Sequence, residues 1–192
     1  MEEEQQLIQR SQLGEQQAFN ELVEMYQGQV YNLALRMLSD SAMAEDAAQE
    51  TFIAAYRAIG GFRGGNFRSW LLRITANTCK DFMRAARSRS HLSLDAMELM
   101  PNSDPPSKEE SPEDYTLRRE LGQAIHAGLE NTPYDQRLAL VLIDVQGYSY
   151  EEAATIMGTS VGTVRSRLSR GRHKLAEYMR RHPELLPSRF RL

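Results

Sequence analysis

Apolar residues recur at helical spacing along almost the whole of this sequence, and this pattern constrains the fold more than any other feature. Between residues 67 and 87, for example, Leu71, Ile74 and Phe82 fall on one side of a helix. No segment shows a convincing alternation of apolar and polar residues, which a half-buried strand would require. We therefore expect an all-α protein.

One segment without helical periodicity divides the chain in two. Residues 88–111, SRSHLSLDAMELMPNSDPPSKEES, are rich in Ser, Pro and acidic residues and lack a sustained apolar stripe, which is typical of a linker. We expect two small helical domains joined by a flexible acidic linker, with boundaries at residues 1–87, 88–111 and 112–180 and a C-terminal tail at 181–192.

Glycine and proline mark the ends of several expected helices. We expect breaks at Gly14 and at Gly60-Gly61, and helix starts at Ser111-Pro112 and Thr132-Pro133, where a hydroxyl side chain precedes a first-turn proline. The first two helices of the second domain are expected to bury Leu117, Leu121, Ala124 and Ile125, and then Leu138, Val141, Leu142 and Val145.

Charge is arranged in blocks of opposite sign, although the net charge is only -3. Residues 57–89 carry eight Lys or Arg and one Asp, and residues 160–181 carry seven Lys or Arg and one Glu. The segments 1–56 and 90–114 are strongly acidic. Two compact basic patches in an otherwise acidic chain indicate two contacts with a polyanion.

Several functional classes are disfavoured by composition. No apolar run approaches the length of a membrane span, so we expect no membrane insertion and a cytoplasmic protein. Cys79 is the only cysteine, and the four histidines are scattered, so we expect no metal. We also find no nucleophile and base pair and no phosphate-binding glycine loop, and we expect no cofactor and no enzymatic activity.

Residues 149–172, SYEEAATIMGTSVGTVRSRLSRGR, have the pattern of a helix-turn-helix. Ser149 and Glu152 form a capping-box pair, Gly158 suits the turn, and Ser160 can cap a second helix. The apolar stripe of that second helix leaves its hydroxyl and arginine side chains facing outward, as major-groove recognition requires. The alternative is a solvated arginine face on a core helix, which we consider the weaker interpretation because capping, glycine spacing and charge coincide.

The residues expected to contact duplex DNA lie on this second helix. Arginine can bond guanine in two places, and Ser or Thr can bond base edges or phosphates. The candidates are Ser160, Thr163, Arg165, Ser166, Ser169 and Arg170, together with Arg172 and Lys174 as phosphate contacts.

The first basic patch has a different chemistry, because aromatic residues are interleaved with arginines around a glycine loop. Phe62, Phe67 and Trp70 alternate with cations, a combination that suits unstacked bases of single-stranded DNA. The alternative is that the aromatics are core residues; we favour it for Trp70 and leave it open for Phe62 and Phe67. The candidates for this contact are Phe62, Arg63, Asn66, Phe67, Arg73, Asn77, Lys80 and Arg84, the last four on one polar helix face with Arg87.

The whole pattern resembles a bacterial RNA polymerase sigma factor of the extracytoplasmic-function (ECF) group, the compact kind with only the second and fourth sigma domains. The resemblance covers most of residues 5 to 180. Four blocks carry it: GEQQAFNELVEMY, AEDAAQETFIAAYRAIGGFRG, FRSWLLRITANTCKDFMRAARSR and TPYDQRLALVLIDVQGYSYEEAATIMGTSVGTVRSRLSRGRHKL.

The resemblance implies a protein that recruits core RNA polymerase to promoter DNA. Its fourth domain would read the -35 element as duplex, and its second would melt and capture the -10 element as a single strand, with one base entering the loop Phe62 to Asn66. Asp46, Gln49 and Glu50 resemble the surface that contacts the β' clamp helices. The alternative is that the carboxylates near the start of this helix only favour its own dipole, and the two interpretations are compatible.

The resemblance also implies further partners. These are the β flap of the polymerase and an anti-sigma factor, with the acidic linker directed toward the active-site and RNA-exit channels. We expect a monomer when the protein is free. The rival interpretation is a one-component helix-turn-helix transcriptional regulator, which would bind duplex DNA without polymerase.

Overall fold

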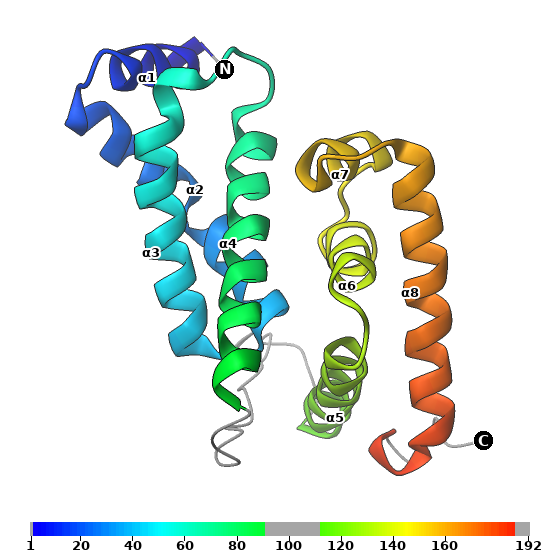
Figure 1. The fold of residues 1–192 in the computed structure, drawn as a ribbon. Coiled ribbons are helices and arrows are strands. Elements are labelled where there is room, and N and C mark those ends of the chain that lie inside the picture. The colour runs from blue at the N-terminus through cyan, green and yellow to red at the C-terminus, as the bar shows by residue number, and fades with distance from the viewer. Residues whose placement is uncertain (1, 91–111, 187–192) are drawn as a thin grey trace.

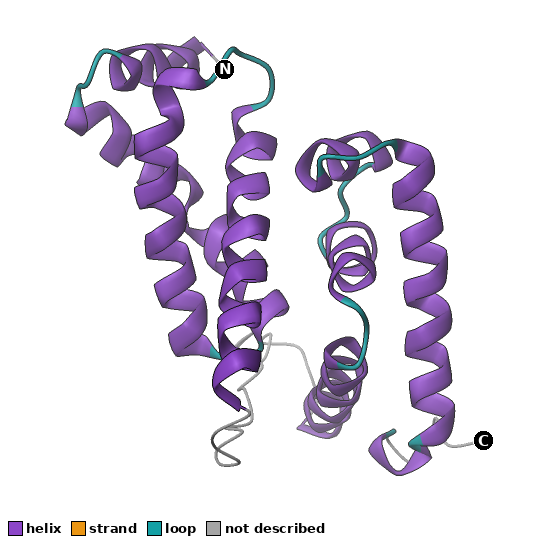
Figure 2. Cartoon of the chain, in the orientation of Figure 1, coloured by secondary structure: helices purple, strands orange, loops and turns teal. Residues whose placement is uncertain are grey.

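The structure is a computed structural model of the chain, and it describes residues 2–90 and 112–186. In these two ranges every regular element is helical, as Figure 2 shows, and the all-α prediction is confirmed. The helices are α1 (Glu2–Gln12), α2 (Gln16–Leu38), α3 (Ser41–Ala58), η1 (Ile59–Gly61), α4 (Phe67–Ser90), α5 (Pro112–Glu130), α6 (Tyr134–Leu140), η2 (Val141–Val145), α7 (Tyr150–Met157), α8 (Val161–Arg181) and η3 (Pro183–Leu185).

The N-terminal bundle consists of α1 to α4, with α2, α3 and α4 packed on one another and α1 lying against α2 (Figure 1). The expected breaks are present, because Gly14 with φ +91° separates α1 from α2, and a 3-10 turn follows α3 at Gly60-Gly61. The last helix is longer than the sequence predicts. It continues to Ser90, into the segment assigned to the linker, and the rest of that segment lies outside the described residues.

The C-terminal bundle consists of α5 to α8 and η2. The helix start after Thr132 is confirmed, but the predicted cap is wrong: the Thr132 hydroxyl donates to the Gly128 carbonyl at 3.0 Å, and Pro133 occupies the cap position without a side-chain bond. Leu138, Val141 and Leu142 are buried as expected.

Two of the expected core residues in this bundle are exposed instead. Val145 is 40% exposed because η2 is π-helical, and its wider turn rotates the last residue away from the α-helical stripe. Ile125 is 37% exposed because α5 packs mainly against α8 and η3, which leaves its remaining side uncovered. Leu121 is only partly buried, and the Leu117 side chain lies outside what the structure describes.

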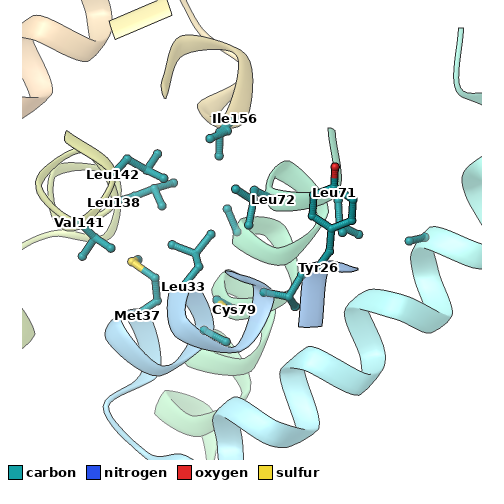
Figure 3. Packing of buried hydrophobic residues seen from close by; sticks show 14 of the residues in the cluster. Tyr26, Leu33, Met37, Leu71, Leu72, Cys79, Leu138, Val141, Leu142 and Ile156 are labelled. Atoms are coloured by element: carbon teal, nitrogen blue, oxygen red, sulfur yellow. The ribbon is translucent and has the colours of Figure 1, made fainter. Parts of the chain in front are cut away.

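The two bundles pack directly on each other and share one hydrophobic core. Figure 3 shows Leu33, Met37 and Leu72 of the N-terminal bundle facing Leu142 and Ile156 of the C-terminal bundle. Each of these side chains is at most 1% exposed. Complete burial of a side chain of this size contributes about 1.5–3 kcal/mol, so the contact is a substantial one.

Candidate nucleic-acid interface

Helices α7 and α8 form the helix-turn-helix that the sequence predicts. The Ser149 hydroxyl accepts from the backbone N–H of Glu152 at 3.1 Å, and the Glu152 carboxylate accepts from the backbone N–H of Ser149 at 3.0 Å, which confirms the capping box. These bonds hold the pKa of the Glu152 carboxyl below its usual value. Gly158 ends α7 with φ 60° and ψ 41°, and Ser160 caps α8 by accepting from the N–H of Thr163 at 3.2 Å.

The outward face of α8 presents two exposed arginines in its first three turns. The guanidinium of Arg165 lies over the Tyr150 ring, 5.3 Å from its centre, and Arg170 donates to the carbonyl and hydroxyl oxygens of Ser166 at 3.2 and 3.1 Å. Ser169 is also exposed, whereas Thr163 is partly buried. The arginines are held by weak local contacts, so they can turn toward a nucleic acid.

Two of the predicted phosphate contacts are already paired. Arg172 forms a two-point bond with Asp144, at 2.9 and 2.6 Å, and Lys174 lies 3.3 Å from Glu177. Both pairs are on the surface, where an ion pair contributes roughly 0–1 kcal/mol. Exchange of these carboxylates for a phosphate would therefore meet little resistance.

The loop before α4 encloses an aromatic cluster. Phe62 meets Phe67 edge to face, with ring centres 5.5 Å apart, and lies 5.3 Å from Trp70. Phe67 is 3% exposed and belongs to the core, while Phe62 is half-buried. Asn66 is engaged as a helix cap, because its side chain accepts from the N–H of Ser69 at 2.9 Å. Of the aromatic candidates, Phe62 therefore offers the more accessible stacking surface.

The polar face of α4 contains the remaining candidates of the first patch. Arg73, Asn77 and Lys80 are exposed at helical spacing, and Arg84 lies 3.1 Å from Asp81 of the same helix. Arg63 is exposed on the preceding loop. The Arg87 side chain lies outside what the structure describes. This face and the outward face of α8 therefore each expose several cations.

Ion pairs between the two bundles were not predicted from the sequence. The Asp135 carboxylate of α6 lies 3.8 Å from Lys80 of α4 and 3.1 Å from Arg167 of α8, so one acid joins the two basic helices. Arg68 also pairs with Glu152, and its guanidinium lies over the Tyr148 ring, 4.9 Å from its centre. Local periodicity contains no signal for such long-range pairs.

Comparison with known families assigns both halves of this arrangement. The N-terminal bundle matches the family model for Sigma-70 region 2 over residues 22–89, and the C-terminal bundle matches that for Sigma-70, region 4 over residues 123–175. Curated relatives match over nearly the whole chain. The chain belongs to the ECF sigma factors.

The relatives and solved structures agree on this assignment. The sigma factor is 41% identical to the RNA polymerase sigma-H factor of Pseudomonas aeruginosa over 91% of its own length and 92% of the relative. It is 42% identical to the ECF RNA polymerase sigma-E factor of Escherichia coli K12, and this match covers 88% of this chain and 90% of the relative. Its fold is similar to that of CnrH, whose structure was solved in complex with the cytosolic domain of CnrY. The TM-score is 0.64 at 27% sequence identity, and the match covers 92% of this chain and 97% of the CnrH chain.

A second solved structure is the sigma factor RpoE of Bartonella quintana in complex with the anti-sigma factor NepR. It has a TM-score of 0.63 and 26% identity, and the match covers 84% of this sigma factor and 96% of that chain. Because the matched family consists of transcription initiation factors, the interpretation as a one-component regulator is not supported.

The acidic surface of the sigma factor lies on α3, away from the cations described above. Asp46, Gln49 and Glu50 are all exposed, and Ile53 is 45% exposed one turn further along the same helix. The helix N-cap is Asp40, whose carboxylate accepts from the N–H of Met43 at 2.7 Å. The three predicted polymerase contacts therefore form one accessible patch with an apolar residue beside it.

Other chemistry of the sigma factor is limited. Cys79 is buried, and burial raises the pKa of its thiol to about 12, so it is not reactive at neutral pH. Within the described ranges no group of three or more His, Cys, Asp or Glu is placed to hold a metal ion. None of the helices in those ranges has the length and apolar character needed to span a membrane.

Proposed function

We propose that this sigma factor divides promoter recognition between its two basic helices and binds polymerase through its acidic one. Residues 1–87 act as sigma domain 2 and residues 112–180 as sigma domain 4. The observation that supports this division is that α4 and α8 each expose a row of cations and each belongs to a different family-matched region. Such rows are the electrostatic footprint of nucleic-acid binding.

The outward face of α8 reads the -35 element as duplex DNA. Arg165 and Arg170 contact base edges in the major groove, with Ser160, Thr163, Ser166 and Ser169 as further contacts to bases or phosphates. Arg172 and Lys174 exchange their surface carboxylates for phosphate oxygens.

The loop before α4 and the polar face of α4 capture the melted -10 element. Phe62 supplies a stacking surface worth about 1–3 kcal/mol per base, and the exposed cations hold the backbone of the strand. Asn66 keeps its role as the cap of α4 and so shapes the loop rather than reading a base. Phe67 supports Phe62 from the core.

Promoter binding by this arrangement requires the two bundles to separate. Lys80 and Arg167 share the carboxylate of Asp135, and Arg73 lies against Gly158 at the turn of the helix-turn-helix. Cations held in this way cannot all face DNA at once. Core polymerase, which binds the α3 surface at Asp46, Gln49 and Glu50 and domain 4 through its β flap, stabilises the separated state.

An anti-sigma factor stabilises the opposite, inactive state. In one of the similar solved structures the sigma factor RpoE of Bartonella quintana is bound to the anti-sigma factor NepR, and in another CnrH is in complex with the cytosolic domain of CnrY. The protein acts in the cytoplasm as a monomer when free, and the acidic linker enters the channels of the polymerase that carry RNA.

Run-off transcription with core RNA polymerase on a randomised promoter library tests the function directly. The expected result is enrichment of two conserved elements, with no specific binding by the isolated chain in a gel shift. Specific binding of duplex DNA by a dimer of the isolated chain would contradict the proposal.

Polymerase binding is tested separately by Glu50→Lys. This variant should lose co-purification with core polymerase, whereas Glu24→Lys, an exposed acid on α2, should retain it. If both variants co-purify with core polymerase equally well, Glu50 is not part of the polymerase interface.

A further inference from the structure

The loop that leads into α4 is held at its two ends and is unsupported in between. At its start the N–H of Phe62 donates to the carbonyl of Ile59 at 3.0 Å, and at its end the Asn66 side chain caps α4. The two glycines between them have φ +92° and +95°, a region that residues with a Cβ rarely adopt. Among the described residues, none hydrogen-bonds to the backbone of residues 63–65. The ends of the loop therefore determine where its side chains lie.

A side chain of α1 adds a further restraint at the start of this loop. Figure 1 shows α1 and the loop at the same end of the N-terminal bundle. The Gln12 amide nitrogen donates to the carbonyl of Phe62 at 2.8 Å and to the carbonyl of Ile59 at 3.1 Å. Both donor hydrogens of the amide are used, and the peptide groups on both sides of Phe62 are bonded. The conformation of Phe62 therefore depends on a residue fifty positions earlier in the sequence.

Apolar packing gives this side of the loop little support. An open hollow of about 350 Å³ lies between α1 and residues 62–65. In the part of the chain that the structure describes, Gln12 is the one side chain of α1 that hydrogen-bonds to the loop. The Sigma-70 region 2 match begins at residue 22, so α1 lies outside the segment that the family model describes. The family assignment therefore does not imply this link.

The restraint matters because Phe62 carries the exposed ring of the loop. Phe62 has φ -69° and ψ 115°, and its ring lies against those of Phe67 and Trp70, with centres 5.5 and 5.3 Å away. The ring is half-buried, so part of its surface remains open. Backbone torsions set the direction of the Cα–Cβ bond and the rotamers that are allowed. The bonds on both sides of Phe62 therefore fix where its ring points.

We propose that Gln12 is a positioning residue for capture of the single-stranded -10 element. By bonding two carbonyls of the loop, it holds Phe62 in the orientation from which the ring stacks on an unpaired base. Without Gln12, binding would first have to order the start of the loop, and this entropic cost would reduce affinity. The stacking surface itself still belongs to Phe62. This inference rests on the proposed recognition of a single-stranded -10 element.

The test measures how holoenzyme, assembled from the full chain and core polymerase, binds two DNA probes in fluorescence anisotropy. One probe is a fork junction that is single-stranded over the -10 element, and the other is a duplex that contains only the -35 element. Gln12→Ala should lower affinity for the fork junction about threefold to tenfold, as loss of a neutral hydrogen bond would, and leave affinity for the duplex unchanged. Gln6→Ala, the same change at an exposed position of α1, should leave both affinities unchanged.

A double-mutant cycle shows whether Gln12 acts through Phe62. Phe62→Ala alone should lower affinity for the fork junction at least about fivefold, because a stacking surface is lost. Adding Gln12→Ala to this variant should have no further effect, because no ring remains to be positioned. A residue with a general structural role would instead cause the same loss in both backgrounds.

Trp70 reports the restraint in the free chain, without polymerase. It is the single tryptophan of the sequence, and its ring lies against that of Phe62. Gln12→Ala should increase the quenching of its fluorescence by acrylamide, because a released loop covers the indole less. Gln6→Ala should be quenched like the wild-type chain. Urea midpoints of both variants should match that of the wild-type chain, since Gln12 and Gln6 are exposed.

The outcomes separate this inference from the proposed function. Unchanged affinity for the fork junction, or unchanged quenching, in Gln12→Ala would overturn the role of Gln12. Equal losses for both probes, or in both backgrounds of the cycle, would show that Gln12 does not act on strand capture through Phe62. If Phe62→Ala binds the fork junction like the wild-type chain, the stacking role in the proposed function fails, and this inference fails with it. A wild-type holoenzyme that does not distinguish promoter from non-promoter DNA would contradict the proposed function itself.

Discussion

Arg137 of α6 donates a hydrogen bond to the carbonyl oxygen of Met37 of α2 at 2.8 Å, across one hundred residues of sequence. Its second terminal nitrogen donates to the carbonyl of Glu130 at 2.6 Å. Met37 lies in the last turn of α2, and Glu130 is the last residue of α5. One guanidinium, 3% exposed, therefore satisfies the C-terminal carbonyls of two helices, where a cation is also favoured by the helix dipole.

Replacement of Arg137 by Met should destabilise the chain. Met retains most of the apolar stem but leaves both carbonyls without their charged donor, and a hydrogen bond to a charged group is worth about 1.5–3 kcal/mol. Urea denaturation should show a loss of about that size. Arg57→Met, at an exposed arginine of α3, serves as the control. If the urea midpoint of Arg137→Met equals that of Arg57→Met, water replaces the guanidinium as the donor to both carbonyls without loss of stability.

Local sequence predicted the helices and the caps at Ser149 and Ser160, but not the contact between the bundles. Helical periodicity and the pair Ser149 and Glu152 act over a few residues, so they can be recognised in one segment. The partners of Asp135 and Arg137 come from distant helices, and neither residue type specifies where its partner lies. The one available signal is Arg137 itself, a cation adjoining the apolar run that begins at Leu138.

Packing also limits how two of the predicted single-strand contacts can take part. Asn66 and Phe67 stand in a loop with the composition of a single-strand binding site, yet one caps α4 and the other is in the core. Composition indicates the chemistry of a segment, and packing decides which of its members remain accessible. The contact of Gln12 with this loop was not predicted, because α1 reaches the loop only through the fold.

Asp135→Asn should increase the affinity of the free chain for DNA. The change removes the carboxylate that holds Lys80 and Arg167, so both cations become available to phosphate. Each additional phosphate contact should raise the magnitude of the salt slope of log K by about 1. Fluorescence anisotropy over a series of salt concentrations measures this slope.

The matched control for that experiment is Glu24→Gln. It removes the same charge from an exposed position of α2, where no ion pair with a described residue is lost, so the contact between the bundles remains. An equal rise in slope for both variants would attribute the effect to net charge alone.

Gly158→Ala and Gly162→Ala should change stability in opposite directions. Gly158 has φ +60°, which costs a residue with a Cβ about 1–2 kcal/mol, and the new atom would lie 2.9 Å from the Arg73 guanidinium. Gly162 is helical, and a Cβ there would lie in ordinary contact 3.9 Å from the Ser160 hydroxyl oxygen, so alanine there should stabilise by up to about 1 kcal/mol. Thermal unfolding of the two variants measures the difference, and a shift of the same sign in both would exclude turn geometry as the cause.

Arg165→Ala and Arg170→Ala should relax recognition of the -35 element. A lost two-point contact with a base is worth about 1–3 kcal/mol of discrimination, and this loss should appear as reduced preference for the matched element in run-off transcription. Arg180→Ala, at an exposed residue near the end of α8, should preserve the preference. Equal loss of transcription on matched and altered elements would assign the two arginines to phosphate contacts.

His126 should make the stability of the C-terminal bundle depend on pH between neutral and mildly acidic conditions. Burial lowers the pKa of its imidazole from the ordinary value of 6.5, Arg137 and Arg36 lower it further, and Glu130 opposes the shift. Because the folded pKa is below the unfolded one, the unfolded state binds more protons in this range. Stability is therefore complete above about pH 6.5 and falls as the pH drops toward the folded pKa.

Urea midpoints measured at pH 7.5 and 5.5 test this dependence on His126. The decrease should be smaller in His126→Gln than in the wild-type chain, because the variant has no imidazole to protonate. His173→Gln, which changes an exposed histidine of α8, should retain the wild-type decrease. If His126→Gln shows the same decrease in midpoint as the wild-type chain, the proton that destabilises the fold is taken up by a group other than His126. That group would not be an ordinary carboxylate, because carboxylates with ordinary pKa values stay ionised over most of this pH interval.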